Sequence, residues 1–180
     1  MDILEGANQA TENRMSLHTG GNCTVTGSGE TGTLVTKNCF AYAAGQDANA
    51  GCAVLPSSSI PSYGTEFNSQ QGGVFAMEWT SIAIKIWFFP RGSIPASIRA
   101  GRPHPAAFGT PAANFQARCI DSYFAPQKLV SLGPKARNSS CPANKLTVPS
   151  SLTRRSAVTT LATFGNQDHG EHSRLLHIER

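Results

Sequence analysis

Residues 74–89 read VFAMEWTSIAIKIWFF and carry the clearest structural pattern of the chain. Its two halves are rich in aromatic and β-branched residues, which favour strands, and Thr80-Ser81 between them allows a tight turn. Gly72-Gly73 precedes the stretch and Pro90 ends it. Alternation along the first half places Phe75, Met77 and Trp79 on one face and Val74, Ala76 and Glu78 on the other. We therefore predict an antiparallel hairpin.

The composition favours the same structural class. Of the 180 residues, 39% are hydrophobic and only 14% are charged, and the chain holds 17 Gly and 11 Pro. Such a composition is typical of an all-β fold with many turns, and the length suits one domain. The sequence contains no run of about 18 apolar residues, so we expect no transmembrane helix.

The net charge of +4 is unevenly distributed along the chain. Residues 1–131 hold eight Lys/Arg and eight Asp/Glu, whereas residues 132–180 hold seven and three, which gives the whole excess. So dilute a charge is not the clustered basic face of a nucleic-acid-binding protein. Aromatic residues and strand patterns also fade from about Leu132. We therefore predict a domain over residues 1–131 and a divergent, disordered tail over residues 132–180.

The long polar segment 45–73 is interrupted by Gly and Pro, and we expect it to be irregular. Five cysteines lie in the chain. A bridge between Cys39 and Cys52 would close a loop of about 14 residues and contribute on the order of 3 kcal/mol in the chain-entropy model. The alternative is two free thiols in a reduced protein.

Two carboxylates lie in the strand-like N-terminal run Met1-Asp2-Ile3-Leu4-Glu5-Gly6. Strict alternation would place Asp2 and Glu5 on opposite faces, but a β-bulge between them would bring them to the same face, as often occurs beside active sites. The alternative is a chain start with scattered charges. Residues 15–19 also alternate, with Ser16 and His18 on the face opposite Met15, Leu17 and Thr19, which predicts a further strand.

Several segments together resemble fungal glycoside hydrolase family 16, and most closely its secreted endo-β-1,3(4)-glucanases, or laminarinases. The resemblance covers residues 1 to about 131. It implies a jelly-roll β-sandwich, incomplete at both ends here, with a glucan-binding cleft across its concave sheet. The segments that carry it are residues 1–6, 16–19, 49–52, 72–80, 84–95 and 111–116.

The active-site motif of that family reads Glu, apolar, Asp, apolar, apolar, Glu, Gly. The resemblance therefore implies that Asp2 is the assisting carboxylate and Glu5 the general acid/base. The motif position of the nucleophile falls one residue before Met1. A retaining glycosidase requires two carboxyl groups about 5–5.5 Å apart, so we expect the chain as written to be inactive.

The resemblance also implies substrate-binding roles for His18, Glu78 and Trp79. We expect His18 to hydrogen-bond a sugar or a catalytic carboxylate, with a half-buried structural histidine as the alternative. Glu78 either bonds sugar hydroxyls or is paired, since a carboxylate on an apolar face needs a partner or water. Trp79 is either a stacking platform or, as we favour, part of the core. Cys119 is expected to have lost its family partner, with Cys141 a substitute at best.

Three functions are compatible with these observations: a retaining endo-β-glucanase whose reading frame is longer at both ends, a jelly-roll that binds β-glucan without cleaving it, and an unstable fragment. We expect β-glucan as the ligand, a monomer, and neither nucleic-acid nor membrane binding. The family is extracellular, although a charged residue follows Met1 directly and no signal peptide is recognisable. We expect no cofactor and no metal, because the histidines of the tail lack a second ligand pair at zinc-site spacing.

Overall fold

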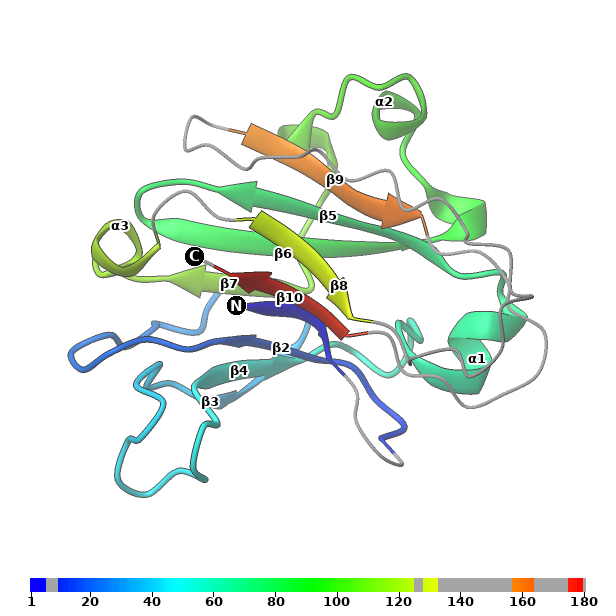
Figure 1. The fold of residues 1–180 in the computed structure, drawn as a ribbon. Coiled ribbons are helices and arrows are strands. Elements are labelled where there is room, and N and C mark those ends of the chain that lie inside the picture. The colour runs from blue at the N-terminus through cyan, green and yellow to red at the C-terminus, as the bar shows by residue number, and fades with distance from the viewer. Residues whose placement is uncertain (6–9, 125–127, 133–156, 164–174, 180) are drawn as a thin grey trace.

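Two β-sheets pack face to face in the computed structural model, which describes residues 1–5, 10–124, 128–132, 157–163 and 175–179 (Figure 1). The six-stranded sheet has the order β3-β4-β2-β1-β10-β8, and the four-stranded sheet has the order β7-β6-β5-β9. All pairings between these strands are antiparallel. The predicted all-β sandwich is therefore confirmed. Within the described residues, no helix combines the length and the hydropathy of a membrane span.

The six-stranded sheet is built from short strands. Its members are β1 (Asp2–Glu5), β2 (Arg14–Leu17), β3 (Thr33–Thr36), β4 (Cys52–Leu55), β8 (Lys128–Leu132) and β10 (Leu175–Glu179). The four-stranded sheet contains β5 (Gly73–Trp79), β6 (Ala83–Pro90), β7 (Ala113–Gln116) and β9 (Ala157–Thr163). The helices are one or two turns long: α1 (Gly64–Ser69), η1 (Arg91–Ser93), α2 (Ala96–Arg99), η2 (Pro105–Ala107) and α3 (Ile120–Tyr123).

The predicted hairpin is present as β5 and β6, paired from Gly73↔Pro90 to Trp79↔Ile84. The Thr80 N–H donates to the Ala83 carbonyl at 2.8 Å and closes the turn. The face prediction is also confirmed, because Phe75, Met77 and Trp79 lie in the main core between the sheets. Val74 and Ala76 belong to a second apolar cluster on the other face.

The main core takes its residues from both sheets, which fixes the inward face of each strand. In β2, Met15 and Leu17 are fully buried within it, and Ile3 joins them from β1. Because side chains alternate along a strand, Ser16 points away from the sandwich interior. The outward face of β1 and β2 therefore carries the polar residues of this part of the chain.

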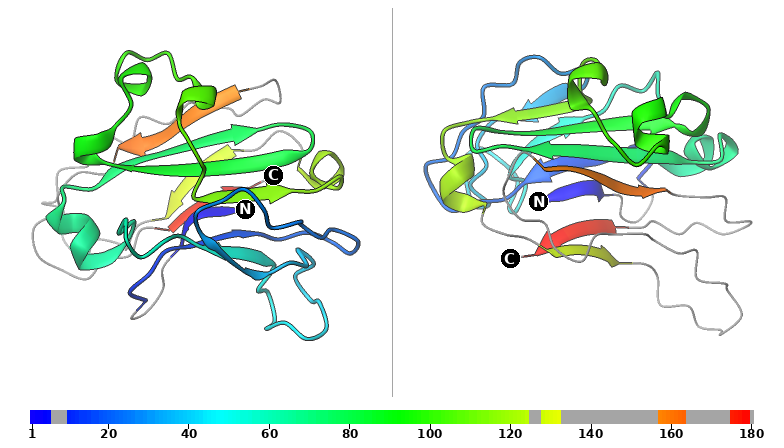
Figure 2. Two further views of the ribbon diagram at one scale, coloured as in Figure 1. Left: turned by 180° about the vertical axis from the view of Figure 1, so that it is seen from behind. Right: turned by 90° about the horizontal axis from the view of Figure 1, so that it is seen from above.

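The outward face of the four-stranded sheet is covered by residues 91–112. Ile98 of α2 and Phe108 pack onto Trp87 in the second cluster, and the Trp87 and Phe108 rings meet edge to face at 5.4 Å. The Trp87 indole N–H also donates to the Gly109 carbonyl at 2.9 Å. Figure 2 shows α2 and its flanking segments on this side of the molecule. This face is thus occupied by the protein itself.

Two sequence-based expectations differ from the structure. Segment 45–73 contains strand β4 and helix α1, although we predicted it to be irregular. Strand β4 gave no alternating signal because Cys52, Ala53 and Val54 are all fully buried, in a strand paired with β2 on one side and β3 on the other. In the predicted disordered tail, residues 157–163 and 175–179 are paired strands. The rest of the tail, including Cys141, lies outside the described residues.

Two disulfides join described segments. Cys39–Cys52 confirms the predicted bridge. Cys119 bonds Cys23, so the expectation that Cys119 lacks its partner is wrong. These two cysteines lie 96 residues apart in sequence, and only the packing of α3 beside the segment around Cys23 brings them together. The Tyr123 hydroxyl of α3 donates to the Gly21 carbonyl in the same contact.

Thiol counting tests both bridges. Of five cysteines, four are in disulfides, so we expect at most one reactive thiol per chain under denaturing, non-reducing conditions. Reduction before denaturation should raise the count to all five cysteines. Three free thiols without reductant would mean that one of the two bridges is absent.

Candidate active site

A β-bulge in β1 brings the two N-terminal carboxylates together. Across β1 and β2, Asp2 pairs with Ser16 and Glu5 pairs with Arg14, so three steps along β1 match two steps along β2. The extra residue reverses the alternation after Asp2 and turns Glu5 to the same face. Of the two alternatives that the sequence left open, the structure therefore contains the bulge.

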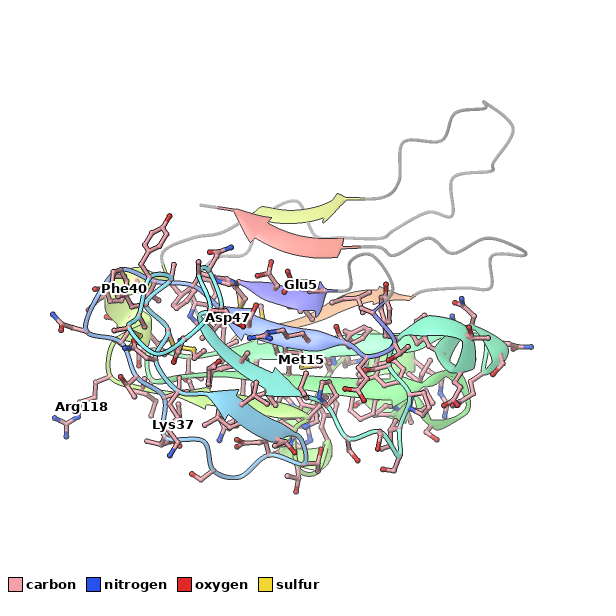
Figure 3. All side chains as sticks on the ribbon, turned by 90° about the horizontal axis from the view of Figure 1, so that it is seen from below. Glu5, Met15, Lys37, Phe40, Asp47 and Arg118 are labelled. Carbon is pink, nitrogen blue, oxygen red and sulfur yellow. A yellow bond between two sulfur atoms is a disulfide. The ribbon has the colours of Figure 1, made fainter. Side chains whose placement is uncertain are left out.

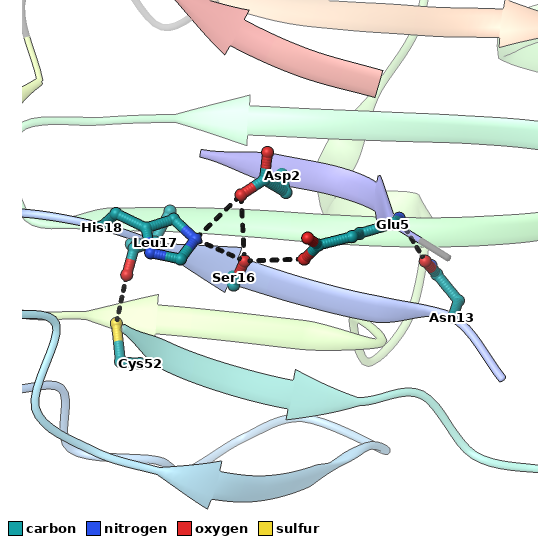
Figure 4. A network of polar contacts seen from close by, with 7 residues as sticks. All are labelled: Asp2, Glu5, Asn13, Ser16, Leu17, His18 and Cys52. Carbon is teal, nitrogen blue, oxygen red and sulfur yellow. Dashed lines mark hydrogen bonds and ion pairs between the residues drawn. The ribbon is translucent and has the colours of Figure 1, made fainter. Parts of the chain in front are cut away.

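Asn13, directly before β2, holds the bulge. Its side-chain carbonyl accepts the Glu5 backbone N–H at 2.9 Å (Figure 4). Its amide donates to the Ile3 carbonyl at 3.1 Å. The Asn13 residue is 2% exposed, so both bonds are shielded from water. One side chain thus satisfies two backbone groups that the bulge removes from the strand ladder.

Four side chains meet on the outward face of β1 and at the end of β2 (Figure 4). His18 Nε2 lies 2.9 Å from Asp2 Oδ2, and the Ser16 hydroxyl lies 3.1 Å from the same oxygen. The Ser16 hydroxyl is also 3.0 Å from His18 Nε2 and 3.5 Å from Glu5 Oε2. We call Asp2, Glu5, Ser16 and His18 the carboxylate cluster. The Ser16 hydroxyl at the centre of the cluster lies within hydrogen-bond distance of both carboxylates and therefore links them, although its single proton can be donated to only one at a time.

The two carboxylates of the cluster occupy different environments. The Asp2 side chain is 6% exposed and bonded to His18, whereas Glu5 is half-buried. Burial lowers the pKa of the neighbouring Met1 α-amino group, and the Asp2 and Glu5 carboxylates partly oppose this effect. One shielded carboxylate beside one more accessible carboxylate is the arrangement from which general acid/base chemistry is built.

The loop after Cys39 approaches the cluster through Gly51. This residue has a φ of +60°, and a Cβ there would lie 2.2 Å from the Leu17 carbonyl oxygen and 2.9 Å from His18 Nδ1. Only glycine allows so close an approach in this conformation. His18 Nδ1 is buried and has no hydrogen-bond partner among the described residues. The His18 ring is therefore confined by backbone on one side and bonded to Asp2 on the other.

Glu78 and Trp79 do not join the carboxylate cluster. Trp79 is 2% exposed within the main core, which agrees with the core alternative for this residue and leaves no ring face open for a sugar. Glu78 lies on the outward face of the other sheet, where its carboxylate pairs with the Lys85 ammonium at 3.2 Å. The whole sandwich separates Glu78 from Asp2, and the structure agrees with the paired alternative for Glu78.

Ser16 and Asn13 are site residues that the sequence reasoning missed. The alternation of residues 15–19 already placed Ser16 on the face of His18, and that pattern was the available signal. Asn13 precedes the strand and gave none. Within the described ranges, no group of three or more His, Cys, Asp or Glu side chains is arranged to hold a metal ion.

The model of XgeA-like catalytic GH16 domains matches residues 1–132. The chain belongs to glycoside hydrolase family 16. The match covers the strands that carry the carboxylate cluster and ends at Leu132, next to the boundary predicted at residue 131.

Three curated relatives come from fungi. An endo-1,3(4)-beta-glucanase of Arthroderma benhamiae is 46% identical over 116 residues, which is 64% of this chain and 25% of the relative. A probable endo-1,3(4)-beta-glucanase of Aspergillus fumigatus is 46% identical over 132 residues, which is 72% of this chain and 19% of the relative. A probable glycosidase of Schizosaccharomyces pombe is 42% identical over 134 residues, which is 72% of this chain and 32% of the relative. The chain thus spans between about a fifth and a third of these relatives.

Solved GH16 structures share the sandwich. An elongating GH family 16 beta-1,3-glucosyltransferase is 46% identical, with a TM-score of 0.59 over 68% of this chain and 40% of that one. Laminarinase 16A from Phanerochaete chrysosporium, solved with β-glucans (6-O-glucosyl-laminaritriose) in its donor and acceptor sites, is 38% identical, with a TM-score of 0.60 over 68% and 42%.

Replacing Asn13 tests how the bulge is held. Asn13→Ala removes an acceptor from the Glu5 N–H and a donor from the Ile3 carbonyl, so we expect the free energy of unfolding to fall by roughly 2–4 kcal/mol. Asn13→Asp keeps the acceptor but turns a buried carboxylate oxygen toward the Ile3 carbonyl oxygen, so it should lose at least as much. Urea denaturation measures both, with the exposed neighbour Glu12→Ala as the control. Equal free energies of unfolding for Asn13→Ala and Glu12→Ala would contradict the role of Asn13 in holding the bulge.

Two glycines with similar backbone angles test the approach of the loop to His18. Gly45 has a φ of +78° with open space around its Cβ position, whereas a Cβ on Gly51 meets backbone. We expect Gly45→Ala to lower the free energy of unfolding by about 1 kcal/mol, from backbone strain alone. Gly51→Ala should lower it by at least about 2 kcal/mol more, because the neighbouring strand must shift. Thermal unfolding compares the two variants, and similar melting temperatures would refute the tight contact between Gly51 and the Leu17 carbonyl.

Proposed function

We propose that the carboxylate cluster is the acid/base side of a retaining β-glucanase active site, with Glu5 as the general acid/base and Asp2 as the assisting carboxylate. The single observation that carries this proposal is the bulge, which places both carboxylates on one face with Ser16 and His18. The endo-1,3(4)-beta-glucanase relatives support β-1,3- or mixed-linkage β-glucan as the substrate.

Glu5 acts twice in the proposed reaction. Its carboxyl group first donates a proton to the glycosidic oxygen as the bond to the anomeric carbon breaks and a nucleophilic carboxylate bonds that carbon. Its carboxylate then takes a proton from water, whose oxygen attacks the same carbon and releases the nucleophile. A half-buried Glu5 suits both steps, because its carboxyl group is accessible to substrate while its backbone is fixed by Asn13.

The strand register indicates where a nucleophile would stand. Asp2 lies opposite Ser16, so the strand position two residues before Asp2 lies opposite His18 and on the same face. The family motif assigns the nucleophile to that position. Asp2, bonded to both Ser16 and His18, would then lie between the nucleophile and Glu5 along β1. In this arrangement Asp2 orients its neighbours and tunes their charge.

The proposal includes the location and the oligomeric state of the protein. The two disulfides and the fungal glucanase relatives support an extracellular protein that meets β-glucan as a polymer. We propose that it acts as a monomer. A second candidate function is β-glucan binding without hydrolysis, which the β-glucans held in the donor and acceptor sites of the 38% identical laminarinase 16A support.

Laminarin hydrolysis tests the proposal in two chains, the 180-residue protein and the same chain carrying an added glutamate directly before Met1. We expect the extended chain to release reducing sugar and Glu5→Gln within it to lose at least about a hundredfold in rate, because the general acid is removed. Glu12→Gln, an exposed glutamate, is the matched control and should change nothing.

Laminarin binding by affinity electrophoresis separates the outcomes. Binding by both chains without release of sugar from either would replace hydrolysis with the non-catalytic function. Absence of both binding and release would overturn the proposal.

A further inference from the structure

An aromatic pair, with one ring exposed, lies on the disulfide-closed loop beside the carboxylate cluster. Tyr42 is 76% exposed, more than any other large apolar side chain of the described residues. The Phe40 ring meets it nearly edge to face, with centroids 5.9 Å apart and planes at 78°. A single exposed aromatic needs no explanation, but here the exposed Tyr42 ring is held in place by an edge-to-face contact with the half-buried Phe40 ring.

The loop that carries this pair is rigid by construction. Cys39 and Cys52 close it, and the Gln46 side chain crosses its base. The Gln46 amide donates to the Asn38 carbonyl at 2.9 Å and to the Gly51 carbonyl at 3.1 Å, while its oxygen accepts the Asn38 N–H at 3.2 Å. A ring presented by such a loop is preorganised, so little conformational freedom is lost when a ligand binds it.

The loop is bonded to the strand end that carries His18. The Thr19 N–H donates to the Cys39 carbonyl at 2.8 Å, and the Ala41 N–H donates to the Thr19 carbonyl at 3.2 Å. Thr19 is three residues from Ser16, or about 10 Å along an extended chain, which is roughly the span of two pyranose rings. Figure 3 shows Phe40 and Asp47 of this loop on the side of the sandwich where Glu5 lies.

We propose that Tyr42, braced by Phe40, is a stacking platform for a glucose unit of β-1,3-glucan that extends from the carboxylate cluster. The inference rests on the proposed function, because a glucan seated at Glu5 supplies the chain that reaches the loop. A pyranose presents axial C–H groups that pack on an aromatic face, and the tyrosine hydroxyl meets the surrounding sugar hydroxyls. The Tyr42 ring therefore contacts a glucose unit of an extended glucan and does not contact the glycosidic bond that is cleaved.

Oligosaccharide length provides the test, with the 180-residue protein and isothermal titration of laminarihexaose and laminaribiose. We expect Tyr42→Ala to weaken hexaose binding about tenfold, from the loss of a stacked ring. Its effect on the biose should be less than about twofold, because the two pyranose rings of a biose at the cluster extend only about as far as Thr19 and leave the Tyr42 ring uncovered. Tyr42→Phe keeps the ring and should bind the hexaose nearly as tightly as the unmodified protein.

A spectroscopic readout locates the contact. The chain has three tyrosines, and Tyr63 and Tyr123 are packed against the core. With 3-fluorotyrosine incorporated, we expect hexaose to shift the fluorine resonance that Tyr42→Phe removes and to leave the other two in place. Ile82→Ala, an exposed apolar side chain at the turn of the other sheet, controls for general loss of surface hydrophobicity and should bind like the unmodified protein.

The outcomes are distinguishable. Hexaose binding that is equal in the unmodified protein and in Tyr42→Ala would overturn the platform while leaving the proposed function intact. An unmodified protein that binds neither laminarihexaose nor laminarin would overturn the proposed function and the platform with it. A shift of the Tyr42 resonance together with a length-dependent loss of affinity supports the platform.

Discussion

The bulge in β1 is the constraint on which the rest of the site depends. A regular strand would send Asp2 and Glu5 to opposite faces, one of them into an apolar core that has no partner for a charge. The extra residue places both on the outward face, and Asn13 satisfies the backbone groups that the irregularity frees. Ser16 and His18 then complete a bonded cluster around Asp2. One additional residue in a strand thus converts two scattered charges into a site.

The two outward faces of the sandwich differ in what covers them. Residues 91–112 fold back over the four-stranded sheet and bury Trp87 beneath Ile98 and Phe108, so that face is closed by apolar packing. The face of β1 and β2 carries polar groups instead. Apolar packing thus covers one outward face, whereas the other carries the carboxylate cluster. Glu78 lies on the covered side of the protein, where it forms an ion pair with Lys85.

The disulfides connect this division to the loops. Cys23–Cys119 joins two segments 96 residues apart, at the end of the sandwich where α3 packs. Cys39–Cys52 fixes the loop beside His18, where Gly51 allows backbone to touch backbone. Loops that must hold a ligand without a hydrophobic core of their own gain their order from such links. The aromatic pair of Phe40 and Tyr42 is consequently held at a defined place relative to the carboxylates.

Features that depend on local periodicity can be predicted from the residues alone. The hairpin of β5 and β6 and the shared face of Phe75, Met77 and Trp79 follow from residue patterns a few positions long. Similar patterns raised a bulge between Asp2 and Glu5 and a Cys39–Cys52 bridge, each as one of two alternatives. Features that depend on distant segments emerge in the folded protein, which joins Cys23 to Cys119, buries residues 52–54 of β4, places Glu78 away from the cluster and brings Asn13 and Ser16 into it. The physical reason is that alternation fixes which face a side chain takes within its own strand, whereas the pairing and packing of strands fix which face is covered and which neighbours it meets.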